Sequence, residues 1–274
     1  MCDICVMESV KERMLSRRDF FKTSALAGAA ATVGGLVSAP AAMADGHGSV
    51  VDMTHKLSPD FPTFFGVPGI STEQQFNFKE HGFNLLNLAI NEHTATHIDA
   101  PLHFSADGKS VDEIPVSDLV VPLCVIDIAA RAAENADTQV TPDDLKAWIA
   151  SHGDIPEKAC IAMHSGWAAK SGDAAKYVGN DADNVKHFPG FHIEATQMLL
   201  EETSAAAMAV DTLSLDHGPS ADFATHYAWL PNGRYGIENL AGLENVPAAG
   251  ATLVVGAPNH VGGTGGPARI FAMV

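Results

Sequence analysis

The chain has 274 residues, of which 46% are hydrophobic and 18% are charged. This composition predicts one globular domain or at most two small ones, and with only four Cys it excludes both a disordered chain and a disulfide scaffold. The formal charge of −17, from 16 Lys+Arg and 33 Asp+Glu, excludes a basic face for nucleic acid or for an anionic membrane. The 13 His are many for so acidic a chain and favour metal binding.

Residues 1–44 are typical of a cleaved export signal. A twin-arginine pattern at 16–22 precedes an uncharged stretch rich in Ala and Gly at 23–43, and a small-x-small cleavage site ends it. A retained membrane anchor is disfavoured, because the stretch is only weakly hydrophobic. We therefore expect a periplasmic protein, exported folded, with its domain at 45–274 and no membrane contact in its mature form. Cys2 and Cys5 stand within the signal and are too few to close a zinc site.

The mature chain alternates predicted strands with predicted helices. Apolar runs predict strands at 50–57, 120–128, 159–163, 205–210 and 252–257, and they predict that Cys124 and Cys160 are buried. Thr141, Pro142 and the acids after them predict the start of a helix, and a spacing of three to four residues predicts another helix at 193–200. This alternation predicts an α/β fold.

The segment HTATHIDAPLHF at 93–104 carries the candidate chemistry. Its ligand-type side chains all stand at odd positions, namely His93, His97, Asp99 and His103. On a helix, position 99 would lie roughly 200° from position 93, at about 100° per residue, whereas alternate residues of an extended chain share one face. The spacing therefore predicts an extended strand that ends at Pro101, with His103 in the loop beyond it.

A divalent metal explains this face better than a solvated edge strand or a pH-sensing histidine cluster. Buried imidazoles and carboxylates need a cation or hydrogen-bond partners, and the even-numbered face of the segment is increasingly apolar. The sequence therefore predicts a metal site on the face formed by His93, His97, Asp99 and His103.

The segment also resembles the signature of the metal-dependent cyclase/formamidase family, which includes bacterial kynurenine formamidases and isatin hydrolases. The matching pattern is His93-x-Ala-Thr-His97-x-Asp99-x-Pro101-x-His103-Phe104, with Ala95 where the family usually has Gly. Further stretches that resemble the family lie at 51–54, 165–167, 211–214 and 263–269, so the resemblance covers essentially the whole mature chain.

The resemblance implies a single-domain swivelling β/β/α fold and a second pair of ligands. Family members have a His followed by a Glu twelve residues later, and His226 and Glu238 stand at that spacing on either side of a predicted turn at 231–233. Together with His93, His97 and Asp99 they would bind one or two ions of Zn²⁺ or Mn²⁺. Isatin hydrolases use one Mn²⁺ and need not keep this Glu, so Glu238 favours the two-metal formamidase type.

The resemblance further implies an amide C–N hydrolase similar to arylformamidases, acting on a small molecule and forming a homodimer or higher homo-oligomer. Metal-activated water would attack the carbonyl, and His103 is the predicted general acid/base that returns a proton to the leaving nitrogen. The alternatives are opening of a cyclic amide as in isatin hydrolases, a cyclase or dehydratase with the same metal, and a binding protein without turnover. Export argues against routine formylkynurenine turnover and for an environmental amide or ester.

The remaining motifs are less informative. His164 stands at a predicted strand end, where such folds place pocket residues. His217 beside Asp216 and the other His are expected in loops, at the surface or in packing. The chain has no G-x-S-x-G and no Walker loop, which disfavours a serine hydrolase and a P-loop nucleotide site.

Overall fold

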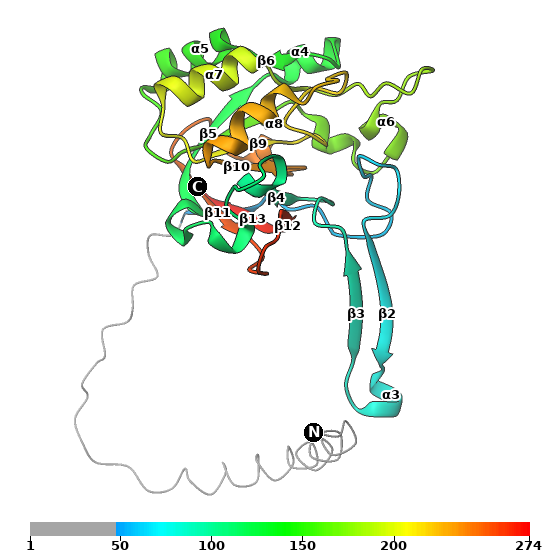
Figure 1. The fold of residues 1–274 in the computed structure, drawn as a ribbon. Coiled ribbons are helices and arrows are strands. Elements are labelled where there is room, and N and C mark those ends of the chain that lie inside the picture. Colours follow the sequence, from blue (N-terminus) through cyan, green and yellow to red (C-terminus); the bar gives the residue numbers. More distant parts are fainter. Residues whose placement is uncertain (1–47) are drawn as a thin grey trace, which may run out of the picture. The chain divides into compact units, whose positions relative to one another are not determined.

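The structure, a computed structural model, describes residues 48–274 (Figure 1). The predicted export signal, with Cys2 and Cys5, lies outside the described residues. Within them, residues 72–88 form a unit of their own, distinct from the unit formed by 48–71 and 89–274, and each is described by itself.

The larger unit is built on one nine-stranded mixed sheet, in the order β1-β13-β11-β5-β7-β9-β10-β4-β12 among the residues described. Its strands are β1 Val50–Asp52, β4 His97–Asp99, β5 Val120–Asp127, β7 Cys160–His164, β9 Ala207–Val210, β10 Tyr235–Glu238, β11 Ala251–Gly256, β12 Gly265–Pro267 and β13 Arg269–Met273. The central strands β5, β7, β9 and β10 run parallel to one another. The outer pairs are antiparallel. A further parallel pair joins β6 Gln139–Val140 to β8 Gly190–Phe191.

Helices connect the parallel strands, as the alternating pattern predicted. The α-helices of this unit are α4 Ala129–Glu134, α5 Pro142–His152, α6 Ala174–Val178, α7 Ile193–Glu202 and α8 Ala224–Trp229. Short 3₁₀ helices are η1 Pro101–Phe104, η2 Val111–Glu113, η3 Val116–Asp118, η4 Trp167–Lys170, η5 Leu230–Asn232 and η6 Leu243–Asn245. The predicted start of α5 is confirmed: Pro142 is its first residue, and the N–H of Thr141 donates to Asp144 at 2.8 Å.

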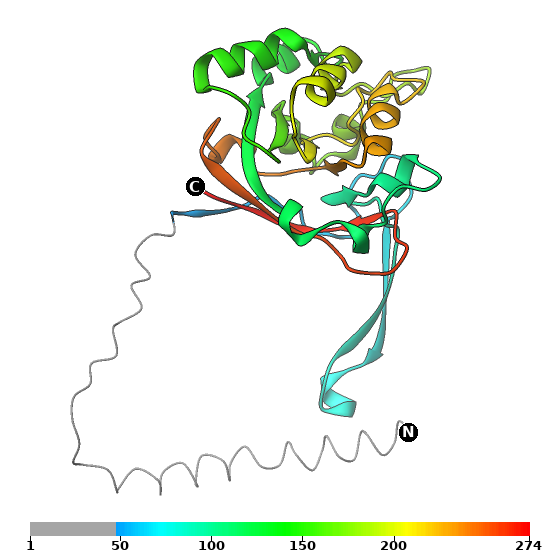
Figure 2. The same cartoon turned by 60° about the vertical axis from the view of Figure 1, so that its left-hand side comes forward.

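Alternate residues of the central strands pack into two apolar clusters, one on each face of the sheet. On one face, Cys124 and Ile126 of β5 pack in a cluster with residues of α5, α7 and α8, which lie together on that side of the sheet (Figures 1 and 2). On the other face, Leu123 and Val125 of β5 join residues of β11 and β13. Cys124 and Cys160 are both buried, as predicted. The central strands, β10 among them, are therefore covered on both faces, and β4 pairs with β10.

The smaller unit, residues 72–88, makes up most of a β-hairpin. Strand β2 Ile70–Phe76 pairs with β3 Leu85–Ile90, and the short helix α3 Phe78–His81 lies at the turn between them. Every residue of β3 is exposed, although most of them are apolar. A two-stranded hairpin has no second layer on which to bury such side chains.

No helix among residues 48–274 is long and apolar enough to cross a membrane.

Candidate metal centre

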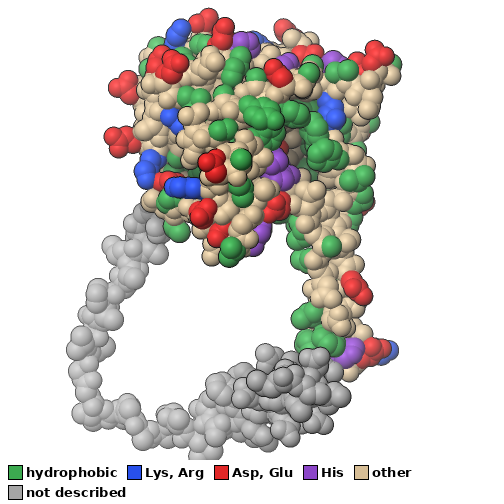
Figure 3. Space-filling view, in the orientation of Figure 1, with side chains coloured by type: hydrophobic (Ala, Val, Ile, Leu, Met, Phe, Trp, Pro, Cys, Tyr) green, Lys and Arg blue, Asp and Glu red, His purple; other side chains and the backbone are tan. Residues whose placement is uncertain are grey.

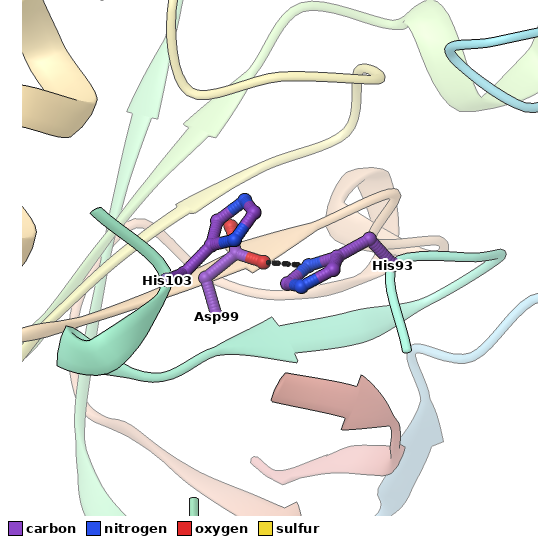
Figure 4. Close-up of side chains that lie close together, drawn as sticks. All are labelled: His93, Asp99 and His103. Atoms are coloured by element: carbon purple, nitrogen blue, oxygen red, sulfur yellow. Dashed lines mark hydrogen bonds and ion pairs between the residues drawn. The ribbon is translucent and has the colours of Figure 1, made fainter. Parts of the chain in front are cut away.

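The predicted metal ligands come from separate parts of the chain and meet at one place. Strand β4 supplies His97 and Asp99, and its antiparallel neighbour β10 supplies Glu238, whose Cα pairs with that of His97. His226 lies on α8, and His93 lies in the bend before β4. Figure 4 shows the His93 ring turned toward Asp99, with His103 beside them.

The nitrogen and oxygen atoms at the centre of this cluster lie close together. His93 Nδ1 lies 2.7 Å from one oxygen of Asp99, and His97 Nε2 lies 3.3 Å from the same oxygen. Glu238 lies 3.4 Å from His97 Nε2 and 3.1 Å from His226 Nε2 through its two oxygens. Three imidazoles and two carboxylates therefore form one connected cluster, and all but His93 are buried.

The outer nitrogen of two of these rings is committed to an acceptor. His97 Nδ1 donates to the carbonyl of Ala95 at 2.9 Å, because a carbonyl can only accept, and His226 Nδ1 donates to the Asp216 carboxylate at 2.6 Å. In the neutral rings, each Nε2 therefore turns a lone pair toward Asp99 and Glu238. Lone pairs that face carboxylate oxygens in a buried site need a proton or a metal cation between them.

Unpartnered atoms at the same place support a metal. Among the buried side-chain atoms of the described residues, His97 Nε2 and Asp99 Oδ2 have no hydrogen-bond partner. The set His97, Asp99 and Glu238 could hold a cation, as could the set His93, Asp99 and His103. Imidazole with carboxylate is the donor set typical of Zn²⁺ and Mn²⁺ sites. The residues present fit a divalent ion.

The electrostatics of the cluster point the same way. Burial opposes the charge on His97, but the Asp99 and Glu238 carboxylates outweigh it and raise its pKa to about 10. Burial also opposes protonation of His226, yet Asp216, Asp99 and Glu238 raise its pKa well above the usual value. Conversely, burial would raise the pKa of Asp99, but His97, His226 and His93 bring it well below the ordinary range. The site thus attracts positive charge strongly.

The predicted extended strand is confirmed at its C-terminal end, which lies before Pro101 with His103 beyond it, but it is wrong at its N-terminal end, where residues 93–96 form a bend. Only 97–99 are strand, and residues 101–104 form the 3₁₀ helix η1, which begins at Pro101. Ala95 has a left-handed backbone with φ of 51°, which breaks the alternation before β4. His97 and Asp99 lie on one face of β4 because they are alternate residues of a strand. His93 is brought to the cluster by the bend before β4, and His103 is brought there by η1. Glycine adopts this conformation without the cost of roughly 1–2 kcal/mol that Cβ adds, which gives a physical reason for the Gly expected at position 95.

His103 lies against His93, with ring centroids 3.8 Å apart in a stacked arrangement. Burial lowers its pKa to about 4, with His93 and His226 adding to the effect against the pull of Asp99 and Glu238. Its ring is therefore neutral near pH 7 and able to accept a proton.

A cavity of about 330 Å³ opens next to the cluster and is lined by His93, His97, His103, His226 and Glu238 together with aromatic rings. The rings are those of Phe64, Phe65, Phe104 and Phe223. Figure 3 shows histidine side chains in a hollow bordered by hydrophobic ones. Such a cavity suits a flat apolar ligand with one polar group directed at the histidines.

Sequence reasoning missed several residues around the site. It took Asp216 only as a neighbour of His217, although Asp216 binds His226, and it gave no role to Phe64, Phe65 or Phe223. His217 does not line the cavity, and neither does His164, which borders a separate cavity with His55 and Asp211. The sequence feature that could have predicted the role of Asp216 is its place ten residues before the ligand His226.

A curled mixed sheet that carries a buried histidine and carboxylate cluster beside an aromatic cavity defines a candidate metalloenzyme of the α/β class. The chain belongs to the Cyclase family ("Putative cyclase"), whose family model matches residues 51–217. That match includes His93, His97, Asp99 and His103 and ends before His226. The twin-arginine translocation signal model matches residues 14–34, so the predicted export signal is confirmed.

Known relatives cover most of the chain. Isatin hydrolase from Roseibium aggregatum is 29% identical over 252 residues, which is 85% of this chain and 95% of the relative. Kynurenine formamidase from Salinibacter ruber is 25% identical over 81% of this chain and 95% of the relative. The solved structure of isatin hydrolase A from Labrenzia aggregata, bound to benzyl benzoate, is 36% identical with a TM-score of 0.77, over 82% of this chain and 93% of that one. The α/β fold expected from the family resemblance is confirmed.

Proposed function

We propose that this protein is a metal-dependent hydrolase that cleaves an amide C–N bond attached to an aromatic group. The observation that carries the proposal is the set of imidazole lone pairs directed at Asp99 and Glu238 on the wall of an aromatic cavity. The relatives named isatin hydrolase and kynurenine formamidase support the same bond type.

The ligands we propose are His93, His97, Asp99, His226 and Glu238. A bound divalent ion would polarise the amide carbonyl and lower the pKa of water to around 7. Two carboxylates among five ligands are enough to bridge two ions, so both one and two ions of Zn²⁺ or Mn²⁺ are compatible with the donor set. Elemental analysis of protein purified from an exporting host gives the identity and the number of ions per chain.

His103 is the proposed general acid/base. Its neutral ring accepts a proton from the attacking water and returns it to the nitrogen as the C–N bond breaks. An anilide nitrogen leaves poorly without that proton, so the second transfer matters as much as the first. The hydroxide of the water joins the carbonyl carbon and the other proton goes to the nitrogen, so the products are an aromatic amine and a carboxylic acid, which releases its proton to solvent near pH 7.

The aromatic cavity favours an aryl amide over an aliphatic one. Phe104 lies beside the cluster, with its ring centroid 4.6 Å from that of His226, and Phe223 lies 5.9 Å from the same ring. A planar substrate packed against these rings would present its carbonyl to the ligands. The linear candidate is an N-formyl aromatic amine, and the cyclic candidate is an isatin-type lactam, which the 36% identity to isatin hydrolase A favours.

The test is turnover by protein loaded with Mn²⁺ or Zn²⁺. Formate release from N-formyl aromatic amines identifies the arylformamidase type, and opening of isatin to its carboxylate identifies the cyclic type. Loss of water from a β-keto substrate, with neither of the first two reactions, would instead indicate a cyclase or dehydratase. Tight binding of these ligands with no turnover under any metal would indicate a binding protein.

The proposed location is the periplasm, supported by the twin-arginine signal. Fractionation of the native host, with and without an Arg17→Lys, Arg18→Lys double substitution, tests it. The double variant should remain in the cytoplasm.

We further propose a homodimer or higher homo-oligomer, supported by the exposed apolar residues of the hairpin. Leu86 and Leu88 of β3 are each 54% exposed, and Phe78 of α3 is 63% exposed. Apolar groups gathered in this way mark protein interfaces more often than free surface. Light scattering after size exclusion gives the mass, and a Leu86→Asp, Leu88→Asp double substitution should lower it to that of a monomer.

A further inference from the structure

His93 differs from the other two imidazoles of the centre in how its outer nitrogen is held. Its Nδ1 faces Asp99 at 2.7 Å, and its Nε2 lies 2.9 Å from the hydroxyl oxygen of Thr264. A hydroxyl both donates and accepts, so this contact alone leaves the position of the ring proton open.

Glu92 removes that freedom. Its carboxylate accepts the hydroxyl hydrogen of Thr264 and also the backbone N–H of Thr264 at 3.1 Å. The half-exposed His260 donates to the same carboxylate at 2.6 Å. The single hydroxyl hydrogen of Thr264 is thus directed at Glu92, and the oxygen has only lone pairs left for His93.

The proton of the His93 ring therefore lies on Nε2. Since Nε2 donates to Thr264, Nδ1 of the neutral ring carries the lone pair that faces Asp99. Two acceptors 2.7 Å apart repel each other unless a cation joins them. Like His97 and His226, His93 thus has its outer nitrogen protonated and its inner nitrogen free for a metal. For His93 the orientation comes from Thr264 and Glu92 acting in series, whereas each of the other two rings has a single acceptor.

The loop that carries Thr264 is built to make this contact. Its strand β12 pairs with β4, and the carbonyl of Thr264 accepts from the N–H of Ala100 at 2.8 Å. A Cβ on Gly265 would lie 2.9 Å from the His93 ring, and a Cβ on Gly263 would lie 2.8 Å from the Glu92 carboxylate. Only glycines on both sides of Thr264 let the loop approach both groups this closely.

We propose that Thr264, fixed by Glu92, is a positioning residue that places the His93 proton on Nε2 and so reserves Nδ1 for the metal. This inference rests on the proposed metal centre. Outer partners that orient a ligand His typically change metal affinity by about 10–100-fold when they are removed.

The test is titration with Mn²⁺ alone, by calorimetry, of the exported mature protein after treatment with a chelator. We expect Thr264→Val, which keeps the shape and removes the hydroxyl, to weaken the Kd by about 10–100-fold. Thr264→Ser, which keeps the hydroxyl, should have the Kd of the wild type. Thr252→Val on β11, a strand without site residues, should also leave the Kd unchanged. Glu92→Ala should weaken binding severalfold, because the hydroxyl hydrogen is then free to turn toward His93.

Nitrogen NMR of the Zn²⁺-loaded protein with ¹⁵N-labelled histidine tests the proton position independently of affinity. We expect His93 to be protonated at Nε2 in the wild type and in Thr264→Ser. A Kd for Thr264→Val equal to that of the wild type, or a His93 proton on Nδ1, would overturn the proposal. Failure of the wild type itself to bind Mn²⁺ would instead overturn the metal centre.

Discussion

Asp216 accepts a hydrogen bond from Nδ1 of His226 at 2.6 Å, and the opposite nitrogen of the same ring lies 3.1 Å from Glu238. The Asp216 carboxylate also accepts the backbone N–H groups of Thr225 and His226 at 2.8 and 3.2 Å, in the first turn of α8. One side chain therefore both starts the helix that carries His226 and fixes the orientation of its ring.

Substitution Asp216→Asn should weaken metal binding by about 10–100-fold. The amide of Asn can donate to Nδ1, which would move the ring proton to Nε2 and remove the lone pair that faces Glu238. Titration with Mn²⁺ measures the change, and Asp222→Asn in the same loop is the matched control. Thermal unfolding of the metal-free variant measures how much stability is lost when Asp216 no longer accepts the N–H groups of α8. An unchanged affinity for Mn²⁺ would show that Asp216 has a structural role alone.

His97 and His103 should respond differently to truncation. His97→Ala removes a buried nitrogen that faces both carboxylates, so the purified protein should contain little metal. His103→Ala should retain its metal and lose turnover by about 10²–10⁴-fold, which is the usual contribution of a general acid/base. Metal content and kcat, measured on the same preparations, distinguish a metal ligand from a general acid/base. If His103→Ala lost the metal and His97→Ala kept it, the two roles would be reversed.

The metal-free protein should become less stable as the pH rises from neutral to about 10. Burial opposes protonation of His97, but Asp99 and Glu238 raise its folded-state pKa to about 10 from 6.5. The folded chain then holds a proton that the unfolded chain has lost, so this stabilisation is complete below pH 6.5 and disappears as the pH passes through 10. We expect the contribution of His97 to the free energy of unfolding to fall by roughly 3–4 kcal/mol between pH 7 and 10, at ~1.4 kcal/mol per pKa unit.

Urea unfolding in the presence of a chelator, at steps of pH, measures this change. His97→Asn is the control and should reduce the dependence, leaving the part that comes from His226, whose pKa is also raised. Metal competes with the same proton, so affinity for Mn²⁺ should increase over the same range. A metal-free protein that gains stability toward pH 10 would contradict the charge assignment at His97.

The aromatic wall should decide between aromatic and aliphatic substrates. Phe104→Ala and Phe223→Ala remove rings that line the cavity, and each should raise KM for an aryl amide by about 10-fold, the equivalent of ~1.4 kcal/mol of lost apolar contact. Turnover of a small aliphatic formamide should change little. Phe78→Ala, at an exposed position of the hairpin, is the matched control. An equal effect on both substrates would indicate a general disturbance of the site.

Local sequence patterns predicted much of the framework. Thr141 and Pro142 begin α5 as expected, since capping depends on residues a few positions apart. The apolar runs that became β5, β7 and β9 were recognisable because their composition is set by burial on both faces. The run that became β11 was recognisable by its apolar composition, although only alternate residues of that strand are buried. The alternation of His97 and Asp99 likewise reflects the local geometry of a strand.

The limits of that reasoning appear at Ala95 and in the hairpin. A left-handed residue in the middle of the motif cannot be deduced from alternation, because the bend is maintained by contacts made elsewhere. The apolar strand β3 resembles a core strand in composition, yet all of its residues are exposed.

The sequence by itself determined the export signal, the α/β alternation and the His and Asp pattern of β4, because each depends on residues close together in the chain. The tertiary structure decided which acceptors hold the outer nitrogens of the rings, and it did so through Asp216 and through Glu92 with Thr264. Those partners are joined by the pairing of strands and by loop approach, and hydrogen-bond direction is a property of positioned atoms rather than of spacing along the chain.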